Sequence, residues 1–161
     1  MVTTGQSLEG TYEHKLDTKY RVAVPVHWRP APGQTVQLRL LRWKFSKVPV
    51  LRAMRQEAFD AMLQSIAEDS EIPIGVRSLH QQAVRAESKE VTLNEQGKLT
   101  VPKADAHEYG FEGGGAVHLF GRGNAFDLVA PDRLPEIKKA HEELMERVYA
   151  QSSMGFGQGR E

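Results

Sequence analysis

Three basic side chains and one carboxylate lie close together near the start of the sequence, at Lys15, Asp17, Lys19 and Arg21. In an extended chain, alternate side chains point to one face, so the three cations are expected to share a face. The Asp17 carboxylate can hold the Arg21 guanidinium, which then loses less side-chain entropy on reaching a phosphate or base edge. Such a cluster can contact double-stranded DNA. Two plainer interpretations stay open: a solvated surface, and a salt bridge that only shapes the turn.

Other chemistry finds little support in the residue types and their spacing. The absence of cysteine excludes disulfides, thiolate nucleophiles and thiolate metal sites. The six histidines lack the spacing of zinc ligands, and Gly121 and Gly123 precede a predicted strand rather than the helix of a dinucleotide-binding fingerprint. No nucleophile with a base, and no carboxylate pair, forms a catalytic motif. We expect a protein that is not an enzyme and that uses no metal, cofactor or small-molecule substrate.

The formal net charge is zero, but the charges are unevenly distributed. Lysines and arginines outnumber acids in residues 1–55, and the remainder of the chain is correspondingly acidic. Such a division indicates a nucleic-acid-binding face on a neutral protein, unless folding mixes the two halves. Trp43 and Phe45 alternate with basic residues in the first half. Base stacking on Trp43 is one interpretation, and a core or subunit-interface position for both rings is the favoured one.

An internal repeat organises the sequence. The segment LDTKYRVAVP, which begins at Leu16, matches LNEQGKLTVP, which begins at Leu93, with an offset of 77 residues. Each copy predicts a strand, a polar turn and a second strand of alternating apolar residues that ends at a proline. One such hairpin has an apolar face and nothing to bury it against. We therefore expect the two copies to combine into one small β core with approximate two-fold symmetry.

The spacing of the other apolar residues predicts further strands and about three helices. Alternation favours strands at about 36–40 and 48–51, and again at about 117–119 and 126–129. Helical periodicity predicts helices at about 54–68, at about 75–88 and from Asp132 to about 150. The expected fold class is therefore α+β. Its predicted parts are two repeats at 8–54 and 89–131, connecting helices at 55–88, a C-terminal helix at 132–150 and a disordered tail at 151–161.

The duplication, the helix placement and the Asp-x-x-x-Arg pattern together resemble the MraZ family. The similarity lies in the segments GTYEHKLDTKYRVAVPVHWR, VTLNEQGKLTVPKADAHEYGF and AVHLFGRGNAFDLVAP, and it extends over roughly residues 10–150. The resemblance implies two SpoVT/AbrB-like units of swapped-hairpin fold, a ring of identical subunits and binding to short promoter repeats. It also implies transcriptional regulation of a division and cell-wall gene cluster by a nucleoid-associated protein.

The family signature is an aspartate, two variable residues, a glycine and an arginine, and this sequence departs from it. Asp17 and Arg21 keep its ends, but Tyr20 occupies the glycine position and is strained if the turn requires a positive φ. In the second copy, Asn94 and Lys98 replace the acid and the arginine. Lysine cannot make the two-pronged contact of arginine, so the second turn is expected to differ from the first in function. The predicted DNA-contacting residues of both halves are Lys15, Lys19, Arg21, Lys89 and Lys98.

The sequence also bears on location and leaves other functions open. No long apolar run is present, and the start MVTTGQSLEG lacks the features of a secretory signal, so we expect a cytoplasmic protein. The altered signatures are compatible with a structural or protein-interaction module of the same fold that has lost DNA binding. A third interpretation is an AbrB-like or antitoxin-like regulator that acts as a simple dimer.

Overall fold

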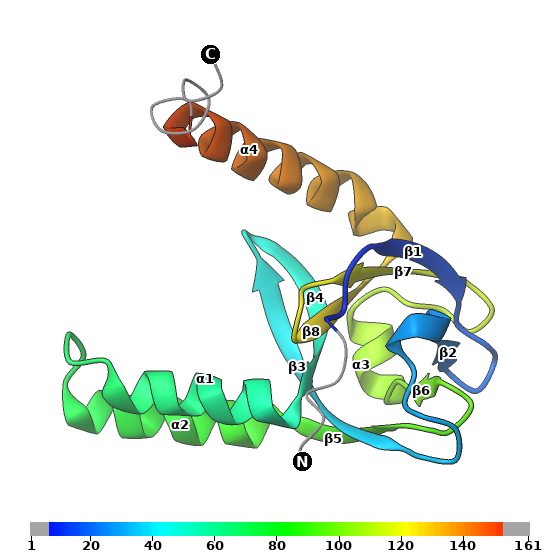
Figure 1. Ribbon diagram of the computed structural model, residues 1–161, viewed down its shortest axis with the longest axis horizontal. Helices are drawn as coiled ribbons and strands as arrows, with labels where there is room; N and C mark the ends of the chain where they lie inside the picture. The colour runs from blue at the N-terminus through cyan, green and yellow to red at the C-terminus, as the bar shows by residue number, and fades with distance from the viewer. Residues whose placement is uncertain (1–6, 153–161) are drawn as a thin grey trace.

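Residues 7–152, which this computed structural model describes, fold as an antiparallel eight-stranded sheet with four α-helices, so the predicted α+β class is confirmed. The strands are β1 (Thr11–Lys15), β2 (Arg21–Ala23), β3 (Val36–Phe45), β4 (Val48–Arg55), β5 (Lys89–Leu93), β6 (Lys98–Thr100), β7 (Ala116–Gly121) and β8 (Ala125–Val129). The helices are α1 (Gln56–Glu68), α2 (Ile74–Glu87), α3 (Lys103–Glu108) and α4 (Leu134–Ser152), and 3-10 turns lie at Val26–Trp28 and Pro131–Arg133 (Figure 1).

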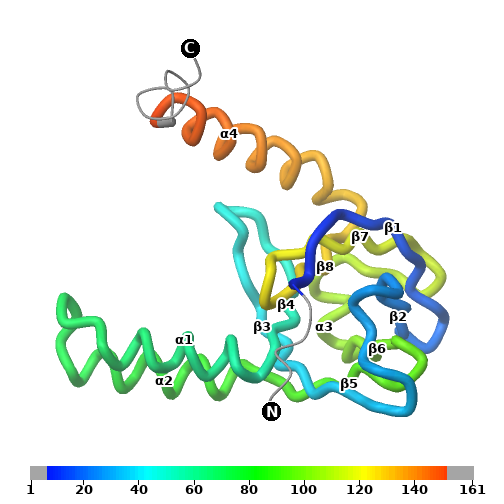
Figure 2. Tube along the Cα trace, viewed as in Figure 1, coloured from blue at the N-terminus to red at the C-terminus, as the bar shows by residue number. Residues whose placement is uncertain are grey.

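The two halves of the sequence interleave within the sheet. Its strand order is β1-β7-β8-β4-β3-β5-β6-β2, so β1 pairs with β7 of the second half and β5 pairs with β3 of the first. The β3–β4 hairpin lies beside β8. The outermost strands come together through a bridge between Leu16 and Val22, which nearly closes the sheet (Figure 2). The strands of one repeat are thus completed by strands of the other.

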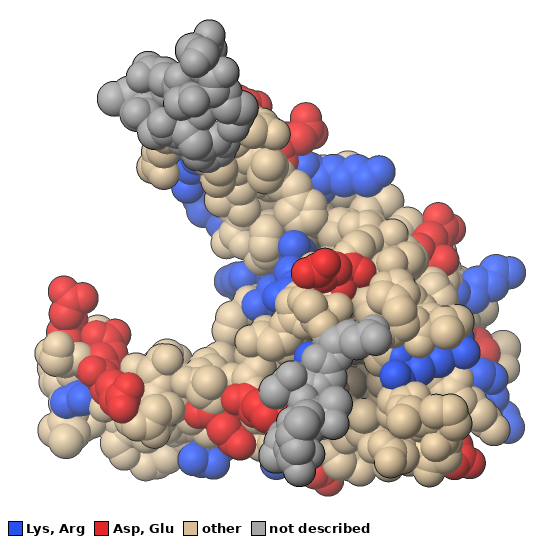
Figure 3. All heavy atoms as spheres, viewed as in Figure 1, with Lys and Arg blue, Asp and Glu red and all other residues tan. Residues whose placement is uncertain are grey.

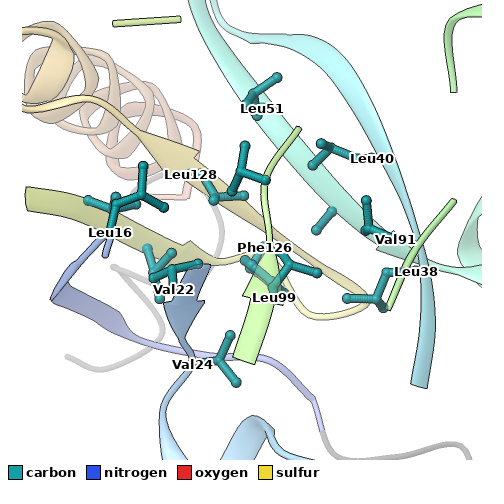
Figure 4. Close-up of a cluster of buried hydrophobic side chains, with 14 of the residues drawn as sticks. Leu16, Val22, Val24, Leu38, Leu40, Leu51, Val91, Leu99, Phe126 and Leu128 are labelled. Atoms are coloured by element: carbon teal, nitrogen blue, oxygen red, sulfur yellow. The ribbon is translucent and has the colours of Figure 1, made fainter. Parts of the chain in front are cut away.

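Apolar side chains from alternate strand positions fill the inside of the nearly closed sheet. Leu16, Val22 and Leu99 are fully buried there, together with aliphatic side chains of β3, β4 and β8 (Figure 4). Burial of a side chain of this size contributes about 1.5–3 kcal/mol of hydrophobic free energy. Because successive side chains of a strand point to opposite faces, burial of Val22 and Leu99 turns Arg21 and Lys98 outward.

Two helical parts project from the sheet: the hairpin of α1 and α2, and α4 (Figure 1). Helix α1 buries Ala58, Phe59 and Leu63, the apolar side that its periodicity predicts. It begins later than predicted because β4 continues to Arg55. Helix α2 and helix α4 lie within two residues of their predicted ends. None of these helices, nor α3, combines the length and apolar character needed to cross a membrane.

Three features differ from the sequence predictions. A fourth helix, α3, follows Pro102, where only the end of a strand was expected. Strands β3 and β4 are longer than predicted, and the extra length includes Trp43 and Phe45, which pack partly buried against the core as the favoured interpretation proposed. In the predicted disordered tail, residues 151 and 152 belong to α4, and residues 153–161 lie outside the described residues.

Candidate nucleic-acid interface

The turn between β1 and β2 is held together by the Asp17 carboxylate. Its Oδ1 accepts the backbone N–H groups of Lys19 at 2.8 Å and Arg21 at 2.9 Å. Its Oδ2 accepts the Nε–H of Arg21 at 2.8 Å, which also forms an ion pair. The hydrogen bond from the Arg21 backbone N–H is the largest influence that lowers the pKa of Asp17, and the bonds from the guanidinium and from Lys19 add to it. The carboxylate therefore both shapes the turn and orients Arg21.

The corresponding turn between β5 and β6 has the same geometry. The Asn94 Oδ1 accepts the backbone N–H groups of Gln96 and Lys98, both at 2.9 Å. The closing backbone bond is also equivalent: the N–H at Asp17 donates to the carbonyl of Arg21 at 2.9 Å, and the N–H at Asn94 donates to that of Lys98 at 2.9 Å. An amide oxygen replaces a carboxylate as the acceptor here. What Asn94 cannot provide is the ion pair that fixes the cation.

Tyr20 occupies a left-handed backbone position, with φ 61°, and Gly97 occupies the equivalent position of the second turn, with φ 77°. The turn therefore has a positive φ at this position, and the tyrosine adopts it. Its hydroxyl shares a hydrogen bond of 2.8 Å with His107 Nε2 on α3, and the two rings meet edge to face. These contacts offset part of the strain of a non-glycine residue in this region.

The two turns are tied to opposite ends of the β2–β6 pair by reciprocal backbone bonds. The Val24 N–H donates to the carbonyl of Gly97 at 2.9 Å, and the Val101 N–H donates to the carbonyl of Tyr20 at 2.8 Å. Between the turns, β2 and β6 are antiparallel, with Val22 opposite Leu99. The strand pair is therefore a short ribbon with one turn at each end.

Three of the predicted DNA-contacting residues share the outward face of this ribbon and its neighbour β1. Arg21 and Lys98 are diagonal neighbours across β2 and β6, because Arg21 lies opposite Thr100 and Lys98 lies opposite Ala23. Lys15 points outward from the end of β1, next to the bridge formed by the buried Leu16. Lys19 lies exposed at the tip of the first turn. On the side of the molecule in Figure 3, basic side chains gather over the region labelled β2 in Figure 1.

The cations of this surface differ in whether they form an ion pair. Arg21 is held by Asp17, whereas the ammonium groups of Lys15, Lys19 and Lys98 form no ion pair within residues 7–152. Glu13, two residues before Lys15, also points outward on β1. We call Lys15, Lys19, Arg21 and Lys98 the ribbon cations.

Lys89 lies apart from the ribbon cations. It shares its side of β5 with the buried Val91 and Leu93, and its Nζ forms an ion pair of 2.6 Å with Asp105 of α3. Asp105 is only 3% exposed, and Arg42 approaches the same carboxylate at 3.8 Å. A lysine that neutralises a buried carboxylate is less available to an outside anion. Lys89 is therefore placed where it stabilises the position of α3.

No family model and no curated protein matches this chain. The functional assignment therefore depends on the geometry of its own residues. Two residues that the sequence reasoning did not select, Thr92 and Thr100, point outward from β5 and β6 beside the ribbon cations. Their alternation with buried leucines and valines was the signal that could have identified them. Within residues 7–152, no cluster of acidic or histidine side chains could hold a metal ion.

Proposed function

We propose that this protein is a sequence-specific DNA-binding transcriptional regulator that acts without catalysis. The observation on which the proposal depends is the shared outward face of Lys15, Arg21 and Lys98 on three adjacent strands. A two-stranded ribbon is narrow enough to enter the major groove of B-form DNA. Arg21, held in place by Asp17, is suited to a two-pronged contact with guanine, and the unpaired lysines are suited to phosphates.

The proposal includes a fold of two pseudo-symmetric swapped-hairpin units. The strand pairing supports it, because the pairing of β1 with β7 corresponds to that of β5 with β3 when the halves are exchanged. The pairs β2–β6 and β4–β8 each join equivalent strands of the two halves. The reciprocal backbone bonds between the two turns follow the same exchange.

Identical subunits assemble as a ring in this proposal, and the ring engages short promoter repeats. One ribbon face offers few cations, so it binds DNA weakly at cellular salt concentrations. Several faces on one assembly raise the effective concentration at successive repeats. The resemblance to the MraZ family supplies the expected target, the promoter of a division and cell-wall gene cluster, and the expected cytoplasmic, nucleoid-associated location. Exposed apolar side chains on α2 and α4 support the self-association.

The decisive experiment measures DNA binding of Arg21→Ala by fluorescence anisotropy over a series of salt concentrations. The DNA is the segment upstream of the protein's own gene. We expect the variant to bind about ten- to a hundredfold more weakly, because one base-edge contact contributes about 1–3 kcal/mol. Lys47→Ala removes an exposed cation at the turn between β3 and β4, outside the ribbon and the projecting helices; it is the control and should bind like the wild type.

The same titration, together with light scattering, distinguishes the other functions. Equal affinity of Arg21→Ala and the wild type for this DNA would contradict the proposed interface. A protein-interaction module without DNA function would give no salt-dependent signal with a sequence preference. A dimeric AbrB-like or antitoxin-like regulator would bind DNA but show the mass of two chains by light scattering.

A further inference from the structure

A buried carboxylate connects three strands on the side of the sheet where α4 begins. Asp127 of β8 is fully buried. Its two oxygens accept Nε–H and Nη2–H of Arg52 on β4, at 2.6 and 2.9 Å. The second oxygen also accepts the Nε–H of Arg122, which follows β7, at 2.8 Å. One carboxylate thus pairs with two guanidinium groups, which leaves one positive charge in excess.

Arg122 extends this network to helix α4. Its Nη1–H donates to His141 Nε2 at 2.9 Å, and its guanidinium carbon lies 3.9 Å from the centre of the Phe45 ring. The other terminal nitrogen, Nη2, is buried and has no acceptor within the described residues. The bond from Nη1 exists only while the Nε2 atom of His141 is unprotonated, because a protonated imidazole is a donor at both nitrogens.

His141 lies at the end of the docked part of α4. Ile137 and Ala140 are buried against the sheet, and the His141 ring contacts Phe45 and Phe120 at centroid distances of 4.9 and 5.2 Å. From residue 142 to residue 151 the helix is exposed and extends away from the sheet (Figure 1). The docking of a long helix therefore depends on little more than two of its turns.

We infer that His141 is a pH-sensitive contact: its protonation removes the acceptor of Arg122 and releases α4 from the sheet. A charged imidazole would lie beside the Arg122 guanidinium, and Nη1 would lose its acceptor next to Nη2, which is buried and has no acceptor within the described residues. A donor that loses its acceptor in such a site destabilises the docked state, and more so when the donor is charged. This unfavourable arrangement is relieved when residues 134–141, the docked part of α4, move away from the sheet.

The groups around His141 act on its pKa in both directions, and the net effect is a lowered pKa. Partial burial lowers the pKa of His141, the Arg122 charge lowers it further, and the Asp127 carboxylate opposes them by raising it. The contacts of the imidazole with β3 and β7 are with the uncharged rings of Phe45 and Phe120, and Arg52 pairs with Asp127. The neighbouring charges on α4, Lys138 and Glu142, are exposed to solvent.

The sign follows from the lowered pKa of the docked state. The undocked histidine binds its proton more tightly, so docking is favoured fully above the ordinary value of about 6.5 and is lost as the pH falls through the lowered pKa. The release requires no DNA and is independent of the proposed function.

Hydrogen exchange of the full chain tests the inference. Protection factors correct for the intrinsic pH dependence of exchange, and we expect those of residues 138–141, whose backbone N–H groups bond within α4, to fall several-fold from about pH 8 to about pH 5. In His141→Gln, the amide oxygen still accepts from Arg122 and does not titrate, so protection should not depend on pH. His80→Gln is the matched control, because His80 is exposed on α2, and it should retain the full dependence.

Two results would overturn the inference: protection of α4 that is constant with pH in the wild type, or a dependence that persists in His141→Gln. If the variant loses docking even at high pH, NMR titration of the wild-type imidazoles decides. The midpoint of His141 is then expected below the ordinary value of about 6.5, and a midpoint equal to or above that value would exclude the release.

Discussion

Tyr20 shows how a position that favours glycine accepts a large side chain. Tyr20 and Gly97 have the same backbone conformation at equivalent places in the two turns. The left-handed region costs a residue with a Cβ about 1–2 kcal/mol. Tyr20 regains part of this through His107 and through packing against the core. At Gly97 the space is filled instead by Arg29, whose Nε–H donates to the Val24 carbonyl at 3.0 Å.

This difference predicts that Gly97→Ala destabilises the protein more than the same change at Gly33. Both glycines have a positive φ, but a Cβ at Gly97 would collide with the Arg29 side chain, whereas nothing lies within 4 Å of one at Gly33. We expect Gly33→Ala to lose about 1 kcal/mol of unfolding free energy, the cost of strain alone, and Gly97→Ala to lose about 1–3 kcal/mol more. Urea denaturation measures both. Equal losses would mean that Arg29 moves aside without cost.

At the scale of the elements, strands β4 and β8 are joined by charge as well as by backbone. Arg52 lies directly opposite Asp127 in the register of these two strands, and all five residues of β8 are buried. Removal of this buried carboxylate would leave two guanidinium groups without a negative charge to pair with. The network is therefore a requirement of this part of the sheet rather than a surface feature.

We predict that Asp127→Ala lowers the unfolding free energy by about 3–5 kcal/mol, the cost of breaking a buried ion pair from one side. Glu108→Ala is the control. It removes the pair of Glu108 with Arg42, in which both side chains are about half exposed, so the loss should be about 0–1 kcal/mol. Thermal or urea unfolding gives both values. A similar, small loss in the two variants would show that Arg52 and Arg122 find other partners.

Local patterns predicted most of these elements but not how they pair. The repeat identified the positions of both turns. The alternation of apolar residues in β2 and β6 is consistent with the outward position of Arg21 and Lys98. Helix α3 was missed because six residues are too few to show a helical period. The place of Lys89 could not be predicted, since its partner Asp105 is brought near only when α3 folds. The pairing of β1 with β7 depends on residues far apart in the sequence, which no local pattern encodes.

At the scale of the whole molecule, the two projecting helical parts expose several large apolar side chains. Helix α2 has no buried residue, and its Ile74 and Leu79 are 76% and 65% exposed. Beyond its docked part, helix α4 exposes a second set of apolar side chains: Leu144, Met145, Val148 and Tyr149. Exposed apolar surface of this extent is typical of protein contacts. In the proposed assembly, these helices lie between identical subunits.

The assembly is tested by light scattering of the wild type and of the double variant Ile74→Glu, Leu79→Glu. We expect the wild type to have a mass that is a multiple of 18.0 kDa, and the variant to have a smaller one at the same concentration, because two carboxylates oppose burial of the α2 surface. The fold should persist, since neither side chain contributes to the core of the chain. Val26→Glu is the matched control, because Val26 is 75% exposed, like Ile74, but lies outside α2 and α4. If all three proteins have the same mass, the α2 surface is not an interface between subunits. Avidity for DNA would then require an assembly formed through α4.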